Sequence, residues 1–211
     1  MFTAVLSKTA KESLALLGKS KVLPKNTYLA GGSALAVHFG HRISVDFDFF
    51  TASHFRGREI VEKLEKLGRF IFQEADEKDT LLGDFKGVKF SLFRYDYPLI
   101  FKPTDFLSIT LADPKDIAAM KLAAIMDRGT KKDFIDIYFL IKKGISIENS
   151  FKYYNQKYRL LANNLYSLIK SLSYFDDAED LEMPEMIKKI NWDEVKKFLQ
   201  KEVVRLANKY I

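Results

Sequence analysis

One stretch restricts the fold of this chain more than any other, the segment 28–50 with the sequence YLAGGSALAVHFGHRISVDFDFF. Asp46 and Asp48 alternate there with apolar residues, so a β-strand would place both carboxylates on one face. Two neighbouring like charges destabilise each other, and a bound divalent cation with oxygen ligands is the usual remedy. The pair therefore predicts a metal site, although an acid pair on the solvated face of an edge strand is the alternative.

A glycine-rich turn precedes this acid pair. Gly31, Gly32 and Ser33 follow the short apolar run 28–30 and come before residues 34–39, which have a helical pattern. Glycines at a strand-to-helix turn let backbone N–H groups and the Ser33 hydroxyl approach a phosphate at the positive end of the helix. Since Mg²⁺ is normally held by a few carboxylates together with substrate phosphates, the turn and the acids predict a phosphate-handling centre.

Three basic residues are candidates for contacts with that phosphate. Arg42 stands shortly before the acid strand, where its guanidinium would reach a phosphate or pair with a carboxylate of the site. Lys121 and Arg128 are seven residues apart on a predicted helix, so their side chains share a face and could clamp a triphosphate. The alternative is a solvated basic pair opposite an apolar face.

Two acids follow on the next predicted helix. Thr130 and Asp133 have the spacing of a capping box, which gives Asp133 a structural task. Asp136 lies one turn further on and would hold Lys121, Arg128 or Lys132 in place. We therefore expect supporting roles for both acids.

Two motifs in this chain resemble the AbiEii/AbiGii toxin branch of the DNA polymerase β-like nucleotidyltransferases. The first is GGSALAVHFGHRISVDFDFF, and the second is the run 116–140, which resembles the Lys-to-Arg helix and basic-Asp-Phe-x-Asp segment of that branch. The resemblance implies a Mg-dependent enzyme that moves an NMP from an NTP to a hydroxyl acceptor. It also implies site residues, with one or two Mg²⁺ ions on Asp46 and Asp48, catalysis by these acids and Lys121, and nucleotide contacts from Gly31, Gly32, Ser33, Arg42, Lys121 and Arg128.

The same resemblance implies a toxin of a toxin–antitoxin or phage-defence pair, with a cognate antitoxin as partner and tRNA or another RNA as acceptor. The net charge of +6 is concentrated between Pro114 and Tyr174, where eleven Lys and Arg residues face five Asp and Glu residues. Such a stripe attracts nucleotides or RNA, but it is also an ordinary solvated helical surface. A predicted acceptor path along it consists of Lys142, Lys143, Lys152, Lys157 and Arg159.

One expected feature of these transferases is missing from the sequence. They usually carry a third carboxylate on a strand after the acid pair, and the matching strand 87–93 has Ser91 in that place. The nearest acids, Asp84 and Asp96, are expected in flanking turns. Two alternatives to the active enzyme stay open, a catalytically degenerate nucleotide- or RNA-binding protein of the same fold and an antitoxin-binding structural protein.

The composition excludes several other classes. None of the 211 residues is cysteine, which excludes disulfides, thiolate zinc sites and a cysteine nucleophile. The histidines His38, His41 and His54 lack zinc-site spacing, so we expect surface or supporting roles for them. No apolar run is long enough to cross a bilayer and no signal-peptide pattern is present, which predicts a cytoplasmic protein without membrane contact.

The spacing of apolar residues predicts an α/β (α+β) head with a small mixed sheet, followed by an all-helical C-terminal domain. Helices are expected at 3–18, 33–39 and 58–67, and strands at 27–30, 45–50, 70–74, 80–82 and 88–93. Beyond Asp113 and Pro114 the pattern is helical, strongest at 158–172 and 192–210. We therefore expect a nucleotidyltransferase-like domain at 1–112 and a helical domain at 113–211 that completes the nucleotide site.

Overall fold

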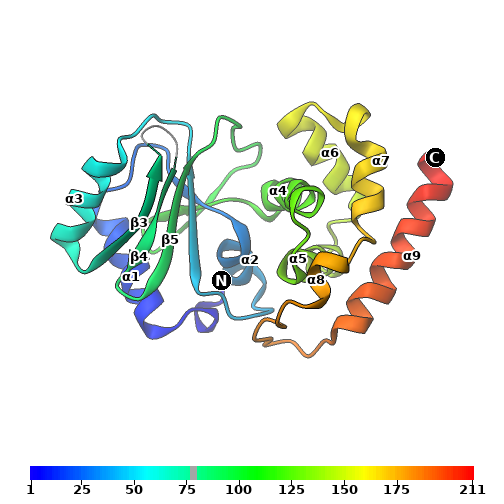
Figure 1. Cartoon of the computed structure of the whole chain (residues 1–211), viewed down its shortest axis with the longest axis horizontal. Helices are drawn as coiled ribbons and strands as arrows, with labels where there is room; N and C mark the ends of the chain where they lie inside the picture. The colour runs from blue at the N-terminus through cyan, green and yellow to red at the C-terminus, as the bar shows by residue number, and fades with distance from the viewer. Residues whose placement is uncertain (77–79) are drawn as a thin grey trace. The chain divides into compact units, whose positions relative to one another are not determined.

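A computed structural model describes residues 1–76 and 80–211 of the chain. Its internal contacts divide it into two compact units, Met1–Asp113 and Pro114–Ile211. The first unit contains strands and helices, and the described part of the second contains helices without a β-strand. The predicted fold class, a mixed α/β head followed by a helical region, is therefore confirmed (Figure 1).

Seven strands form one mixed sheet in the described part of the first unit, in the order β3-β4-β5-β2-β1-β7-β6. Strand β2 runs parallel to β5 and antiparallel to β1, and β1 runs parallel to β7. The strands are β1 (Tyr28–Leu29), β2 (Asp46–Thr51), β3 (Phe70–Asp76), β4 (Thr80–Phe85), β5 (Val88–Arg94), β6 (Thr104–Phe106) and β7 (Ile109–Leu111).

Helices pack against this sheet because its central strands have one largely apolar face. The α-helices of the unit are α1 (Lys8–Ser20), α2 (Gly31–Phe39) and α3 (Gly57–Leu67), and a short 3-10 helix spans Thr3–Val5. Helix α1 contacts β5 and β7, whereas α3 contacts β3 and β4 (Figure 1). Fully buried side chains form the core between the sheet and these helices, including Leu14, Leu17, Phe47, Phe49, Leu64, Phe90 and Leu92.

The structure differs from the sequence prediction in short elements. Strands β6 and β7 were not expected, because a three-residue strand has too few positions to show a period of two. Helix α2 begins at Gly31 rather than Ser33, so the glycines form its first turn instead of a separate loop. The remaining strand predictions lie at the observed strands, with ends that differ by a few residues.

Six helices lie in the second unit. They are α4 (Pro114–Asp127), α5 (Lys131–Lys142), α6 (Ile147–Tyr158), α7 (Leu161–Ser171), α8 (Asp176–Glu179) and α9 (Trp192–Tyr210). Helix α4 contacts α5, α6 and α7, and α9 packs on α5 and α7. An aromatic cluster joins α5, α8 and α9, in which the Phe134 and Phe175 rings lie 4.9 Å apart and the Phe175 and Trp192 rings 5.5 Å apart.

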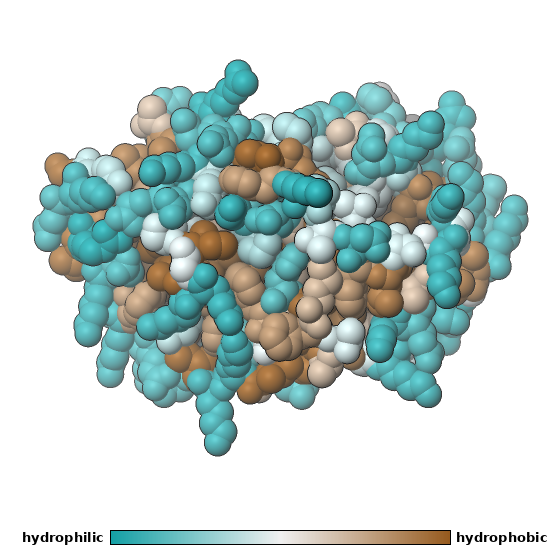
Figure 2. Space-filling view, turned by 180° about the vertical axis from the view of Figure 1, so that it is seen from behind, coloured by the Kyte–Doolittle hydropathy of each residue, from teal (hydrophilic) through white to brown (hydrophobic). Residues whose placement is uncertain are grey.

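One face of the molecule is mainly polar. Hydrophilic side chains predominate on the face shown in Figure 2, and hydrophobic residues there occur in small groups. None of the helices in the described ranges combines the length and the apolar character that crossing a membrane requires.

A buried ion pair joins α6 to α4. Lys157 Nζ lies 3.1 Å from Asp116 Oδ1, and both side chains have an exposed fraction of 0%. Burial lowers the pKa of Lys157, and the Asp116 carboxylate partly offsets this effect. The prediction that Lys157 lies along a surface path for an RNA acceptor is therefore wrong, because its charge is enclosed and paired inside the helical unit.

Removing one member of this pair should cost far more stability than removing both. Asp116→Ala removes the carboxylate beside the buried Lys157 ammonium, and we expect it to lower the free energy of unfolding by about 3–5 kcal/mol. The double variant Asp116→Leu with Lys157→Met removes both charges and should be clearly more stable than Asp116→Ala. Urea unfolding of these two variants and the parent measures the difference, and a double variant no more stable than Asp116→Ala would contradict this account.

Candidate functional site

The two acids of the Asp-x-Asp motif lie side by side on one face of β2. Asp46 and Asp48 are both partly exposed, whereas Phe47 and Phe49 between and beyond them are fully buried. The Phe49 ring also packs on Phe90 of the neighbouring strand β5, with centroids 5.5 Å apart. This aromatic packing fixes the face of the strand that holds the carboxylates, as the alternating sequence predicted.

The glycine turn and the acid pair meet at the start of α2. The Ala30 N–H donates to the Asp48 carbonyl at 3.1 Å, which places the turn beside β2. Gly31 has a φ of +65°, and a Cβ atom on it would lie only 2.9 Å from Asp48 Oδ2. Ala30 at the N-cap has no polar side chain to offer the first-turn N–H groups of α2. The carboxylate and the positive end of the helix therefore share one small region.

Ser33 has a different position from the one expected. Its side chain is 1% exposed, and its hydroxyl donates to the Asp46 carbonyl and lies 2.8 Å from the Ser44 hydroxyl. The hydroxyl thus ties α2 to the start of β2 instead of pointing outward to a phosphate.

Arg42, for which the sequence left open a phosphate contact or an ion pair with a site carboxylate, also lies inside the protein. It is 2% exposed, and its Nη1 donates to the Ile43 carbonyl at 3.1 Å and to Ser44 Oγ at 3.4 Å. A Cβ atom on Gly32 would lie 2.1 Å from Arg42 Nη2. The guanidinium therefore packs directly against the backbone of the turn and supports it from within. Ser44, which bonds both Ser33 and Arg42, was not recognised from the sequence.

No third acid completes the pair on the neighbouring strands. In the parallel pairing of β2 with β5, Ser91 is the partner of Asp48 and Lys89 is the partner of Asp46. Asp84 lies within β4 rather than in a turn, and its Oδ1 accepts the Gly87 N–H at 2.6 Å. Among the described residues, no group of three or more Asp, Glu, His or Cys side chains is placed to hold a metal ion. The Asp46 and Asp48 carboxylates therefore fit one divalent cation whose remaining ligands come from other molecules.

A second group of predicted site residues lies within the helical unit. Lys121 is 6% exposed, and its Nζ lies 2.7 Å from Asp133 Oδ1 and 2.7 Å from Asp136 Oδ2. The alternative of a solvated basic pair is therefore wrong for Lys121. Arg128 differs, because its side chain is 64% exposed while its Nε lies 3.4 Å from Asp133 Oδ2. Lys121 is thus one of the cations that the sequence offered to Asp136 and that the structure places beside it.

Asp133 has the structural task that its position predicted. Its Oδ2 accepts the Thr130 N–H at 3.3 Å and the Thr130 hydroxyl at 2.6 Å, as part of the capping box of α5. Burial alone would raise the pKa of Asp133, but the Lys121 charge and the hydrogen bonds from Lys121 and Thr130 together lower it. The carboxylate thus stays ionised although it is almost completely enclosed.

A family model identifies the family of this chain. The family model described as "Nucleotidyl transferase AbiEii toxin, Type IV TA system" matches residues 16–104 and 93–206, which together span most of the sequence. The chain belongs to the AbiEii nucleotidyl transferase toxin family. An uncharacterized protein of Aquifex aeolicus (strain VF5), aq_aa25, is 43% identical over 183 residues, which cover 83% of this chain and 85% of that protein.

Solved structures show the same fold at low sequence identity. JHP933 from Helicobacter pylori is 16% identical with a TM-score of 0.54, over 97% of this chain and 94% of that one. MenT4, a nucleotidyltransferase toxin from Mycobacterium tuberculosis H37Rv, is 13% identical with a TM-score of 0.57, over 95% of this chain and 85% of that one. These two likenesses support the fold of this AbiEii-family chain.

The histidines of this AbiEii-family chain have no common site. His41 is fully buried and packs edge-on against Phe39, so of the surface and supporting roles that the sequence allowed, the supporting role applies to it. The His38 Nε2 atom lies 3.0 Å from the Ala112 carbonyl oxygen, and burial lowers the pKa of this side chain. His54 is exposed. The structure thus gives two of the three a packing role.

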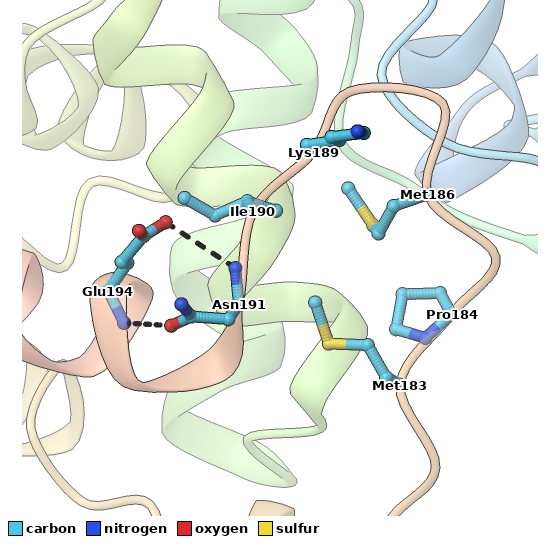
Figure 3. Close-up of a pocket in the computed structure, with 7 residues that line it drawn as sticks. All are labelled: Met183, Pro184, Met186, Lys189, Ile190, Asn191 and Glu194. Atoms are coloured by element: carbon cyan, nitrogen blue, oxygen red, sulfur yellow. Dashed lines mark hydrogen bonds between the residues drawn. The ribbon is translucent and has the colours of Figure 1, made fainter.

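A hollow in the helical unit has none of the predicted site residues in its lining. It has a volume of about 530 Å³ and lies in the segment before α9 (Figure 3). Its polar members Asn191 and Glu194 bond each other across the first turn of α9, in the capping box of that helix. The remaining lining residues are Met183, Pro184, Met186, Lys189 and Ile190. Neither an acid pair nor a basic cluster lines it.

The contact between Gly32 and Arg42 predicts a specific coupling between these two positions. Gly32→Ala should lower the free energy of unfolding by about 1–3 kcal/mol, because its methyl group overlaps the guanidinium. In an Arg42→Ala background the same substitution should cost at least about 1 kcal/mol less. Urea unfolding of the four proteins measures the coupling. Gly68→Ala is the control, since it meets only the flexible Lys86 side chain and should be additive with Arg42→Ala.

The buried Asp133 predicts a defined pH dependence. Because its folded pKa is below the ordinary value of 3.8, its stabilisation is present above that value and is lost as the pH falls through the folded pKa. Asp133→Asn should therefore be less stable than the parent at pH 7, by about 2–3 kcal/mol, and the gap should narrow below pH 4. Unfolding by urea at a series of pH values measures this gap. Asp127→Asn, at the exposed end of α4, should show no such gap at any pH.

Proposed function

We propose that this chain moves a nucleoside monophosphate from an NTP to a hydroxyl acceptor and releases pyrophosphate. The observation that carries the proposal is the contact of Asp48 with Gly31, which joins an acid pair to the start of a helix whose N-cap has no side-chain acceptor. A triphosphate fits this arrangement. Its anionic oxygens can bind at the helix N-terminus, and the carboxylates can bind the cation that accompanies it. Membership of a nucleotidyltransferase family supports nucleotide transfer as the reaction.

In the proposed reaction, an oxygen of the acceptor hydroxyl bonds to the α-phosphorus and its proton is released to water. The bond between the α-phosphorus and the bridging oxygen of the β-phosphate breaks, and pyrophosphate leaves with the electron pair. Asp46 and Asp48 would hold Mg²⁺, which when bound offsets the negative charge that collects on the phosphates. The N–H groups of the Gly31–Gly32 turn orient phosphate oxygens, and Arg42 and Ser33 keep that turn in place from inside.

The helical unit contributes cations in this proposal. Arg128 has a largely exposed side chain and would contact the outer phosphates. Lys121 would add its charge to the leaving group while Asp133 and Asp136 fix its position. An NTP is therefore expected to bind more tightly than the matching NMP.

The proposed setting is a cytoplasmic toxin paired with an antitoxin, with tRNA or another RNA as the acceptor. Family membership supports the toxin assignment. Exposed basic residues in the helical unit support an RNA contact, because charged side chains that neutralise phosphates dominate such binding. With Lys157 removed from the predicted path, the residues left for it are Lys142, Lys143, Lys152 and Arg159, all of them exposed.

One observation favours a second candidate, a degenerate protein that binds nucleotide or RNA without reacting. Ser91 lies in register with Asp48, in the place where these transferases usually carry a third carboxylate. Such a protein would be stabilised by NTP and Mg²⁺ through binding to the folded state, but would release no pyrophosphate with any acceptor. Melting temperatures with and without NTP and Mg²⁺ also distinguish a purely antitoxin-binding protein, because its melting temperature would stay unchanged.

The test is transfer of label from each of the four α-labelled NTPs to total cellular RNA in the presence of Mg²⁺. We expect labelled RNA and an equal amount of pyrophosphate with at least one NTP. Replacing both acids, Asp46→Asn with Asp48→Asn, should reduce transfer at least about hundredfold, because removing one well-placed electrostatic group commonly costs that much. Circular dichroism checks that the variant is folded, and label transfer that is unchanged in it would refute the assignment of the acids.

A further inference from the structure

A residue of opposite charge lies on the same strand as Ser91, which stands where a third acid is expected. A two-metal centre for phosphoryl transfer needs enough carboxylate oxygens to hold both ions. Among the described residues, β2 contributes Asp46 and Asp48 to the site face, Asp84 lies on the same face two strands away on β4, and no cluster of three metal-binding side chains occurs. The structure therefore provides carboxylate ligands for one metal ion, but not for the second ion that the family resemblance allowed.

The register of the sheet places Lys89 beside Asp46. The two residues are partners in the parallel pairing of β2 with β5, and partners in neighbouring strands project from the same face. Burial agrees with this placement, because the next residue of each strand, Phe47 and Phe90, is fully buried on the opposite face. Lys89 itself is exposed. Neighbouring strands are about 4.8 Å apart, so a lysine side chain on β5 reaches the region above the acid pair.

We propose that the Lys89 ammonium takes the place of the second divalent cation in this centre; the inference rests on the proposed function. The exchange preserves charge. Two carboxylates, one divalent ion and one ammonium carry the same net charge as three carboxylates with two divalent ions. Lys89 binds a non-bridging oxygen of the α-phosphate on the side from which the acceptor hydroxyl attacks, where the second ion of a two-metal site acts.

Asp84 is the other acid next to Lys89, and the structure gives it a separate task. It is the partner of Lys89 on the far side, in the antiparallel pairing of β4 with β5. Its Oδ1 accepts the Gly87 N–H of the turn between these strands. An ion pair between Lys89 and Asp84 at this exposed position would contribute little to stability, so it does not by itself explain a lysine on the site face.

The first test counts metal ions. Mn²⁺ is titrated into the protein at saturating non-hydrolysable NTP analogue, and free Mn²⁺ is measured by electron paramagnetic resonance after correction for the analogue alone. We expect one bound Mn²⁺ per chain. Two bound ions would overturn the inference and leave the proposed function intact, whereas no analogue-dependent Mn²⁺ binding would refute the proposed function first.

The second test removes the ammonium. Lys89→Ala should weaken the binding of Mg-NTP and of the matching NMP by a similar factor, about tenfold, because both carry the α-phosphate and a charged hydrogen bond is lost. Lys89→Arg should retain affinity within about threefold, since it keeps the charge. The matched control is Lys63→Ala on the exposed surface of α3, which removes the same charge. Equal affinities for Lys89→Ala and Lys63→Ala, measured by isothermal titration calorimetry, would overturn the inference.

Discussion

The closeness of Gly31 and Gly32 to two charged side chains is the constraint on which the candidate site depends. A Cβ on Gly31 would meet the Asp48 carboxylate, and a Cβ on Gly32 would meet the Arg42 guanidinium. The turn is thus held between an anion on one side and a cation on the other, with only backbone in between. Because neither contact leaves room for a side chain, the position of the helix start, the acid strand and the buried arginine are set together. Ser44 and Ser33 extend this arrangement to the Asp46 carbonyl, so the start of β2 is bonded to the helix that it faces.

In the helical unit, two charged lysine side chains are buried rather than exposed. Lys121 and Lys157 are both buried and each is matched by carboxylates, as burial of a charge requires. Such pairs add little net stability compared with apolar packing, but an incomplete pair is strongly destabilising. They therefore penalise any packing of α4, α5 and α6 that separates the partners. The Asp133 carboxylate has a further task, because it also caps the start of α5.

The sequence predicted the parts of this fold that are governed by local patterns. Alternation in residues 45–50 placed Asp46 and Asp48 on one face, and the spacing of Thr130 and Asp133 predicted the capping box of α5. Contacts between distant positions were not predictable in this way. The approach of Arg42 to Gly32 and the pairing of Lys157 with Asp116 depend on how elements pack, and an exposed and a buried lysine look alike in sequence. Lys89 was overlooked for a related reason, because only the pairing of β2 with β5 shows that it is the partner of Asp46.

The two basic residues of α4 that the sequence treated as equals are physically different. Lys121 lies between two carboxylates at 2.7 Å, so its positive charge is more than balanced by its immediate neighbours. Arg128 has only a long contact to Asp133, at 3.4 Å, and most of its side chain is exposed. With Arg128 included, the two cations and two carboxylates are neutral as a group. Under the proposed function, a triphosphate would gain most from Arg128, because its guanidinium can turn toward phosphate oxygens while Asp133 keeps its bonds from Lys121 and Thr130. Lys121 could contact a phosphate only if Asp133 and Asp136 kept hydrogen bonds from other groups. Asp133 has such bonds, from the Thr130 N–H and hydroxyl.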